Sequence, residues 1–197
     1  MRVLVVNGAY RNAGATEQFV EVVCCVLKQR GIGIDMLVLR DVDIGFCLNC
    51  RACMQQPGTT PGLCALRDAM GDIVRRIEAC DAFVLASPTN AGSVTAIFKR
   101  LIERLAVYGY WPWGVAAPKY RKADSPKKKA ILIATCGAPG ILGRLAFSTQ
   151  RQLAMAAKLV GAKTCGALFS GPHAQTRTAR LTPAQIKRAE RLAGKLL

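Results

Sequence analysis

Arg2-Val3-Leu4-Val5-Val6-Asn7-Gly8 is the stretch from which the rest of the fold can be worked out. Its apolar run is rich in β-branched residues, which predicts a strand buried on both faces, as inside a parallel sheet. The run stops at Asn7-Gly8 and passes into a loop of small residues that ends at Thr16, which we expect to cap a helix. A helix that follows such a loop offers free N–H groups and the positive end of its dipole to an anion.

The loop before this helix favours a phosphate group as the ligand. Arg11 lies within it and would add a charge-assisted hydrogen bond. No Gly-Lys-Ser/Thr triplet ends the loop, and its glycine spacing differs from the G-x-G-x-x-G fingerprint, so neither ATP nor a dinucleotide is indicated. The alternative interpretation is an ordinary connection between strand and helix that binds nothing.

Apolar runs alternate with helical patterns along the rest of the chain. Further strands are expected at residues 34–39, 82–86, 130–135 and 164–169. One continuous helix is expected over residues 143–160, and the last helix should begin with a capping box between Thr182 and Gln185. Five strands alternating with helices predict one α/β domain over residues 1–197, a doubly wound parallel sheet with helices on both faces.

The loops after the first, third and fourth strands should meet at one edge of this sheet. In each of these loops the apolar strand sequence is followed by glycine, proline, serine or asparagine. In doubly wound sheets, ligands bind beyond the carboxyl ends of the strands, at the point where the strand order reverses. We therefore expect the binding site to be built from these three loops.

Basic residues dominate the charge of the chain. Lysine and arginine outnumber aspartate and glutamate by 28 to 12, which gives a net charge of +16. This charge suggests phosphorylated cofactors, acidic partners or nucleic acid as ligands. The sequence has no aromatic and basic platform and no known motif for reading bases, so we expect no nucleic-acid partner.

The composition also bears on the compartment. No apolar run approaches the roughly 20 residues that cross a bilayer, and the apolar run after Arg2 is too short for a signal peptide. The nine cysteines are an odd number in a chain whose residues are 51% hydrophobic, which argues against a secreted disulfide scaffold. We therefore expect a cytoplasmic protein with reduced thiols and no membrane partner.

A cysteine-rich loop is expected between about residues 40 and 67, much longer than the usual connection in an α/β fold. Its cysteines are Cys47, Cys50, Cys53 and Cys64. The first three recur at every third residue, a spacing typical of ferredoxin-like cluster ligands. Zinc more often uses two separated Cys-x-x-Cys pairs, and free thiols or a redox pair remain the other interpretation.

Two of the expected binding loops resemble those of the flavodoxin-like NAD(P)H-dependent FMN reductase family. The segment from Asn7 to Thr16 resembles its Gly-Ser-Pro-Arg-x-x-Gly-x-Thr phosphate loop. The segment from Ser87 to Ala96, followed by Lys99 and Arg104, resembles its Ser-Pro-x-Tyr-x-Gly-x-x-Ser/Thr-Ala segment, with Asn90 in place of the tyrosine. The four loop cysteines are similar to those of the iron–sulfur flavoprotein branch of this family.

The resemblance implies a flavodoxin-like five-stranded sheet in the order 2-1-3-4-5 and a bound FMN. Its phosphate would be held by Ala9, Arg11, Gly14, Ala15 and Thr16. Its ring edge would lie against Pro88, Thr89, Asn90, Ala91, Gly92, Ser93, Cys136 and Gly137. In the iron–sulfur branch, the four loop cysteines would hold a [4Fe–4S] cluster, which this strand order would place beside the phosphate loop.

The implied activity is an oxidoreductase in which NAD(P)H reduces FMN and the flavin reduces an acceptor. The acceptor would be a quinone, a flavin, a metal or an iron–sulfur centre, held by a small molecule or a protein. The family also implies a homodimer or homotetramer. The alternative is a non-enzymatic flavin or iron–sulfur electron carrier, or a redox-responsive interaction protein.

Overall fold

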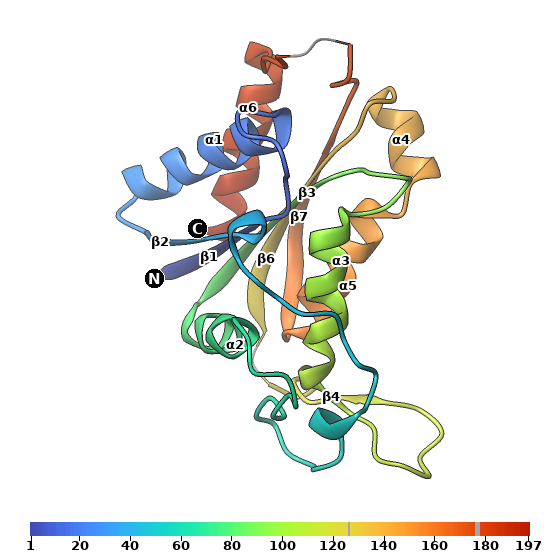
Figure 1. Ribbon diagram of the computed structural model, residues 1–197. Helices are drawn as coiled ribbons and strands as arrows, with labels where there is room; N and C mark the ends of the chain where they lie inside the picture. The colour runs from blue at the N-terminus through green and yellow to red at the C-terminus, as the bar shows by residue number, and fades with distance from the viewer. Residues whose placement is uncertain (126, 176–177) are drawn as a thin grey trace.

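A five-stranded parallel sheet lies at the centre of the computed structural model, which describes residues 1–125, 127–175 and 178–197 (Figure 1). Its strands are β1 (Arg2–Asn7), β2 (Gly33–Val38), β3 (Ala82–Pro88), β6 (Lys128–Thr135) and β7 (Ala162–Ser170). The spatial order β2-β1-β3-β6-β7 confirms the predicted order 2-1-3-4-5. The middle residues of the central strands β1, β3 and β6 are apolar and buried, because helices cover both faces of the sheet.

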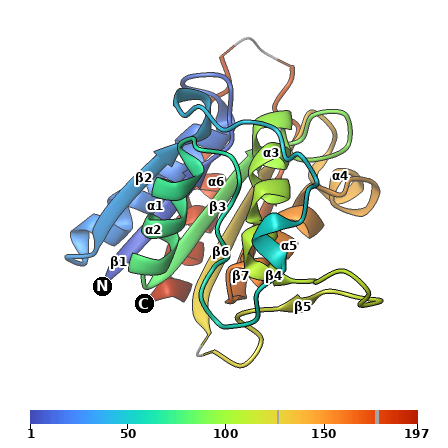
Figure 2. The same ribbon diagram turned by 60° about the horizontal axis from the view of Figure 1, so that its bottom comes forward.

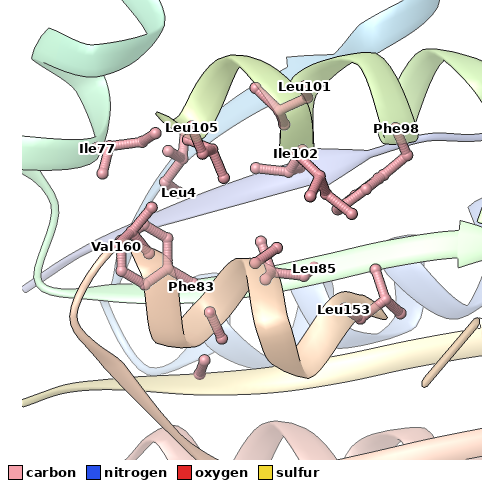
Figure 3. Close-up of a cluster of buried hydrophobic side chains, with 14 of the residues drawn as sticks. Leu4, Ile77, Phe83, Leu85, Phe98, Leu101, Ile102, Leu105, Leu153 and Val160 are labelled. Atoms are coloured by element: carbon pink, nitrogen blue, oxygen red, sulfur yellow. The ribbon is translucent and has the colours of Figure 1, made fainter. Parts of the chain in front are cut away.

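The helices form one layer on each face of the sheet (Figures 1 and 2). One layer holds α1 (Ala15–Gln29) and α6 (Pro183–Ala193), which pack against each other. The other holds α2 (Met70–Ala79), α3 (Ala96–Arg104) and α5 (Thr149–Leu159). Figure 3 shows the core beneath this second layer, where Phe83 and Leu85 of β3 face Leu101 and Ile102 of α3. No helix within the described ranges has both the length and the apolar character needed to cross a bilayer.

Short helical turns complete the chain. They are η1 (Leu39–Asp41), η2 (Ala52–Met54), η3 (Leu105–Tyr108), the seven-residue helix α4 (Gly140–Ala146) and η4 (Gly194–Leu196). The capping box of α6 is confirmed, because the Thr182 hydroxyl accepts from the Gln185 N–H and the Gln185 side chain accepts from the Thr182 N–H.

Two local expectations need correction. The helix expected over residues 143–160 is two helices, because the Ser148 N–H donates to the Gly92 carbonyl at 2.8 Å and leaves the helical ladder. Thr16 does not cap α1, which begins one residue earlier with Gly14 at the cap. The structure also contains a small antiparallel pair that was not predicted, β4 (Gly109–Tyr110) with β5 (Lys119–Tyr120).

Strand β7 forms one edge of the sheet. Its pairing with β6 shifts register at Ala130 and Ile131. Lys163 and Thr164 are exposed on this strand, and a groove of about 330 Å³ lies between it and α6. Arg188, Arg191 and Lys195 line that groove, so the edge is bordered by positive charge.

The long segment between β2 and α2 follows a path that begins at one end of the sheet and reaches the other (Figures 1 and 2). It starts beside the loop after β1, where Arg40 donates to the Ala9 carbonyl at 3.1 Å. It then runs along α3, whose Arg100 and Arg104 donate to the carbonyls of Ile44 and Gly45 at 2.9 and 2.8 Å. At the far end of α3, η2 packs against η3 and β4.

Candidate functional site

A pocket of about 210 Å³ lies beyond the carboxyl ends of β1, β3 and β6. The structure brings most of the predicted binding residues to its wall: Ala9, Arg11, Gly14, Ala15, Thr16, Pro88, Thr89, Asn90, Cys136 and Gly137. The three loops therefore meet where the strand order reverses, as the sequence predicted. Tyr10, Thr135, His173 and Ala174 also line the pocket.

Ala91, Gly92 and Ser93 do not line this pocket. Asn90 and Ser93 exchange two backbone hydrogen bonds of 2.9 and 3.0 Å, which close a tight turn. Ala91 and Gly92 form the tip of that turn with φ values of 46° and 75°. The Gly92 carbonyl accepts from Ser148, so the tip is tied to the start of α5 instead.

Buried hydrogen bonds fix the loop after β1. The Asn7 side chain accepts from the Ala9 N–H at 3.0 Å, and the Thr95 hydroxyl donates to the Gly8 carbonyl at 2.7 Å. Gly8 has no room for a side chain, because a Cβ there would lie 2.7 Å from the Phe98 ring. The beginning of the loop that leads to α1 is thus held against the start of α3.

The charges at the start of α1 are balanced. Glu17 in the first turn accepts from the Ala13 N–H and pairs with Arg40 at 3.1 Å. The Arg40 guanidinium neutralises the carboxylate that would otherwise repel an anion bound at this helix end. Arg11 adds a further positive charge to the pocket wall.

Thr16 links the first turn of α1 to the end of β6. Its side chain is buried, and its Oγ1 lies 2.7 Å from Oγ1 of Thr135. A hydroxyl has one proton, so Thr16 can donate to a ligand only when Thr135 supplies the proton of this bond. The two threonines together therefore offer one hydroxyl donor to the pocket.

His173 reaches the pocket from the segment after β7. Its Nε2 lies 2.9 Å from the Ser170 hydroxyl, and its ring meets Phe19 edge-on at 6.0 Å between centroids. Burial lowers the pKa of this histidine, so the neutral ring is favoured at pH 7. Gln185 donates to the Ser170 oxygen at 3.3 Å, which leaves the Ser170 proton for Nε2 and favours a proton on Nδ1.

Cys136 is a buried thiol in the turn after β6. Its Sγ donates to the Ala138 carbonyl at 3.1 Å, and burial raises its pKa. Helix α4 packs directly against it, because a Cβ on Gly143 would lie 2.6 Å from this sulfur. The thiol is therefore neutral and holds the turn in place at the pocket wall.

The four loop cysteines line a second, smaller cavity of about 40 Å³. Leu48, Met54, Leu66 and Ala106 supply apolar side chains to its wall. The pKa of Cys53 is raised, first by burial and then by the nearby sulfurs of Cys64, Cys47 and Cys50. Over the described ranges, no three histidine, cysteine, aspartate or glutamate side chains are grouped closely enough to hold a metal ion.

Three arginines support this cysteine cavity. The Arg104 Nη2 donates to the Cys64 sulfur at 3.4 Å, and Arg121 donates to the Cys53 carbonyl at 3.1 Å. Arg51 stacks over Trp111 at 3.6 Å and Trp113 at 4.7 Å from the ring centroids. The β4–β5 segment thus clamps the cysteine loop from outside through cation–π contacts.

The cysteine cavity is not beside the phosphate loop, which corrects the expected placement. Thr95 at the start of α3 contacts the loop after β1, whereas Arg104 at its end contacts Cys64. Figure 1 shows the two regions at opposite ends of this helix, whose nine residues span about 13 Å. Sequence order placed the start of the loop correctly, but Arg100 and Arg104 draw the rest along α3.

His173 was not predicted as a pocket residue. It could have been predicted, because ligands bind beyond the carboxyl ends of parallel strands and this rule applies to the fifth strand as well as to the others. The segment Ser170-Gly171-Pro172-His173 follows the carboxyl end of that strand and contains the same kinds of loop residue, serine, glycine and proline. Thr135 could have been found similarly, as the last residue of β6.

Comparison with known proteins places the chain in a flavoprotein family. The family model described as NADPH-dependent FMN reductase matches residues 1–176. An iron-sulfur flavoprotein of Archaeoglobus fulgidus is 32% identical over 104 residues, which cover 53% of this chain and 48% of that protein. A second one from the same organism is 29% identical over 112 residues, covering 57% and 49%. The matches therefore span about half the length of these curated relatives.

Solved structures share the fold at low sequence identity. The NAD(P)H:quinone oxidoreductase from Methanothermobacter marburgensis has a TM-score of 0.69 and 14% identity, covering 100% of this chain and 99% of that one. The azoreductase AzrA has a TM-score of 0.66 and 14% identity, covering 99% and 100%. An archaeal flavodoxin has a TM-score of 0.56 and 10% identity, covering 100% and 96%.

Proposed function

Because this chain belongs to the NADPH-dependent FMN reductase family, we propose that it binds FMN and transfers electrons from NAD(P)H to an acceptor. One observation carries the proposal. The pocket at the carboxyl ends of β1, β3 and β6 is built from the loops that resemble the family's FMN-binding segments. The N-terminal turn of α1 and Arg11 fit a phosphate, since both favour negative charge.

The pocket residues divide the work of holding FMN. Gly14, Ala15 and Thr16 would bind the phosphate through the start of α1, with Arg11 as a cationic partner. Thr89 would lie against the ring edge, and it is held in place because its hydroxyl lies 2.8 Å from that of Thr149 and its N–H donates to the Thr135 carbonyl. Pro88 and Asn90 flank it on the pocket wall.

The bound FMN would supply the redox chemistry, accepting a hydride and releasing electrons. The chain then needs only to bind, orient and shield this group, so no nucleophile or paired carboxylates are required. His173 stays neutral through burial and adds no charge beside the ring. We also propose a reducing, cytoplasmic setting, supported by the cysteines, all nine of which are free thiols.

A visible spectrum and an FMN titration test the proposal. The purified protein should be yellow, or it should bind added FMN with a Kd of about 1 µM. With FMN and a quinone present, it should oxidise NAD(P)H at a few turnovers per second or faster. A colourless protein that does not bind FMN would overturn the proposal. Flavin binding without any NAD(P)H oxidation would support an electron carrier instead.

Replacing Arg11 with alanine should weaken FMN binding by about tenfold to a hundredfold, the loss expected for one charge-assisted hydrogen bond. The affinity for riboflavin should stay the same, because riboflavin lacks the phosphate. Fluorescence titration with both ligands measures the difference. Equal losses for FMN and riboflavin would show that Arg11 acts on the fold or the ring rather than on the phosphate.

We propose further that Cys47, Cys50, Cys53 and Cys64 move together to hold a [4Fe–4S] cluster, since in the described structure their side chains are not yet grouped closely enough for a metal ion. Their soft thiol ligands suit iron–sulfur clusters, and all four line one cavity. Two curated relatives are named as iron-sulfur flavoproteins, which agrees with this donor set. Arg104 and Arg121 would hold Cys64 and the Cys53 backbone in place for the cluster.

Anaerobic reconstitution tests the cluster. Iron and acid-labile sulfide should approach about four per chain and fall sharply in Cys50→Ser. Zinc at about one per chain with no sulfide would point to the alternative metal. Four alkylatable thiols with no retained iron would leave a plain flavin reductase.

We also propose that the protein is a homodimer or homotetramer. Apolar side chains are exposed around the cysteine loop, with Leu63 90%, Phe46 69% and Trp113 67% accessible. Such side chains are usually covered when they gather on a surface. Light scattering at tens of micromolar should report a dimer or a tetramer, and Leu63→Ser with Trp113→Ser should shift it toward the monomer. A monomeric wild-type protein would contradict this prediction.

A further inference from the structure

One third of the chain contains no acidic residue. Residues 125–189 include no aspartate or glutamate, although lysines and arginines recur from Lys127 to Arg188. This region forms β6, α4, α5, β7 and the start of α6, which lie together on the β6–β7 side of the sheet (Figures 1 and 2). The net charge of +16 is therefore distributed unevenly along the chain, although Glu78 and Asp81 of other segments lie beside Lys127 and Lys128 at one end of this region.

An apolar patch lies within this basic region. Helix α4 exposes Ile141, Leu142 and Leu145, whose accessible fractions are 80%, 62% and 78%. The other side of the helix packs inward through Gly143 against Cys136. Three large aliphatic side chains exposed on one seven-residue helix are unusual for a surface with no partner.

Two arginines border this patch. Arg144 and Arg151 are exposed, and with Leu145 and Phe147 they line a hollow of about 330 Å³ beside α4. Neither guanidinium forms an ion pair with any described residue. An apolar centre with a charged, unpaired rim is the arrangement typical of protein interfaces.

The patch also lies next to the proposed flavin pocket. Cys136 lines that pocket and is in contact with Gly143 of α4. A protein seated on α4 would therefore lie within about one helix diameter of the pocket wall. This closeness makes electron exchange between the two proteins possible without a rearrangement of the fold.

We propose that the face formed by Ile141, Leu142, Arg144, Leu145 and Arg151, here called the α4 face, is the docking surface for an acidic electron-carrier protein. The proposal rests on the function proposed above and names the acceptor's class. A carrier with carboxylates around an apolar contact would complement both the rim and the centre. In the net exchange, one NAD(P)H and two oxidised one-electron carriers give NAD(P)⁺, one proton and two reduced carriers.

The charges favour this occupant over two others. A second copy meeting this one through the same face would bring the Arg144 and Arg151 side chains of both copies together, and no carboxylate lines the hollow beside them. A nucleic acid would satisfy the arginines but would leave Ile141, Leu142 and Leu145 against phosphate and water. Binding of single strands usually also uses exposed aromatic rings, whereas Phe147, which lines the hollow beside the α4 face, is only partly exposed.

Direct binding tests the proposal without relying on flavin turnover. The probes are an acidic plant-type [2Fe–2S] ferredoxin and an acidic flavodoxin, titrated by calorimetry against the full chain in 50 mM salt. We expect Kd below about 100 µM, weakened at least about tenfold at 300 mM salt, because charges on an exposed rim are screened. The Arg144→Glu/Arg151→Glu variant should weaken binding by about tenfold or more.

A double variant with the same change in charge at other positions serves as the control, and a second double variant tests the apolar contact. Arg67→Glu/Lys119→Glu changes the net charge equally at exposed positions outside the acid-free region and should alter Kd less than about twofold. Ile141→Ser/Leu145→Ser should weaken binding by about tenfold without changing the charge. Equal losses in the two charge pairs, or no binding of either carrier, would overturn the proposal.

The remaining outcomes are also decisive. Binding of duplex DNA, or self-association, that depends on the α4 face while neither carrier binds would assign the face to another occupant and reject the proposal. A protein that fails to bind FMN but binds a carrier through the α4 face would reject the proposed activity and retain the docking surface. The failures of the two proposals are thus separable.

Discussion

Replacing Gly62 with alanine should remove most of the iron that the cysteine cavity can hold. A Cβ at this position would lie 1.8 Å from the Cys53 carbonyl oxygen and 2.8 Å from its carbon, so one backbone must move. The Gly62 N–H is fixed to the Val107 carbonyl at 2.8 Å, which directs the shift toward Cys53. Mutations that disturb the residues supporting a metal ligand typically lower the affinity for the metal by about tenfold to a hundredfold.

The iron and sulfide content after anaerobic reconstitution measures this effect. The rate at which Cys53 is alkylated in the metal-free protein, followed by mass spectrometry, measures the displacement without relying on metal. Cys53 should react faster in the variant, because the shift opens the cavity around a half-buried thiol. Gly71→Ala is the matched control, since a Cβ there meets no atom within 4 Å. Wild-type iron content in Gly62→Ala, with unchanged alkylation of Cys53, would contradict the predicted displacement of Cys53.

Replacing Arg104 with methionine should destabilise the fold by about 3 kcal/mol, as expected when one partner of a buried ion pair is removed. Its side chain is only 1% exposed, and it bonds Asp68 at 2.5 and 3.0 Å as well as the Gly45 carbonyl at 2.8 Å. In a domain of this size, the melting temperature should fall by about 10 °C. Lys99→Met on the same helix breaks an exposed pair with Glu103 and should change stability by less than about 0.5 kcal/mol.

Acid should reduce the difference between wild type and Arg104→Met. Burial alone would raise the pKa of Asp68, but hydrogen bonds from Arg104, Gly45 and Met70 and the charge of Arg104 lower it below the ordinary 3.8. A carboxylate with a lowered pKa stabilises the fold above its ordinary pKa, and that stability is lost as the pH falls through the folded value. Chemical denaturation between pH 7 and pH 3 should show the two proteins converging, and a constant gap would contradict the assigned ion pair.

The sheet and its ligand-binding edge were predictable because both follow from short-range patterns. Apolar runs marked the strands, and the breaks after β1, β3 and β6 marked the loops that meet at the pocket. The Thr182–Gln185 capping box is a signal contained within four residues, and it is confirmed. Each of these features depends on residues that are close in sequence or on a general rule of parallel sheets.

The path of the cysteine loop was not predictable in the same way. Its position depends on side chains of α3 that are about 50 residues away in sequence, such as Arg100 on the Ile44 carbonyl. The division between α4 and α5 has the same kind of origin, since the Gly92 carbonyl withdraws the Ser148 N–H from the helix. Local helical patterns contain no information about such distant partners.

The open edge at β7 has a consequence for how the protein behaves in a crowded solution. A free strand offers a row of backbone donors and acceptors onto which a strand of another molecule can add, the first step toward a growing fibril. A second copy approaching this edge would bring its own Lys163 and its own α6 cations against those already there. Repulsion between identical edges therefore opposes fibril growth at the exposed part of β7, which includes Lys163, Thr164 and Ala167.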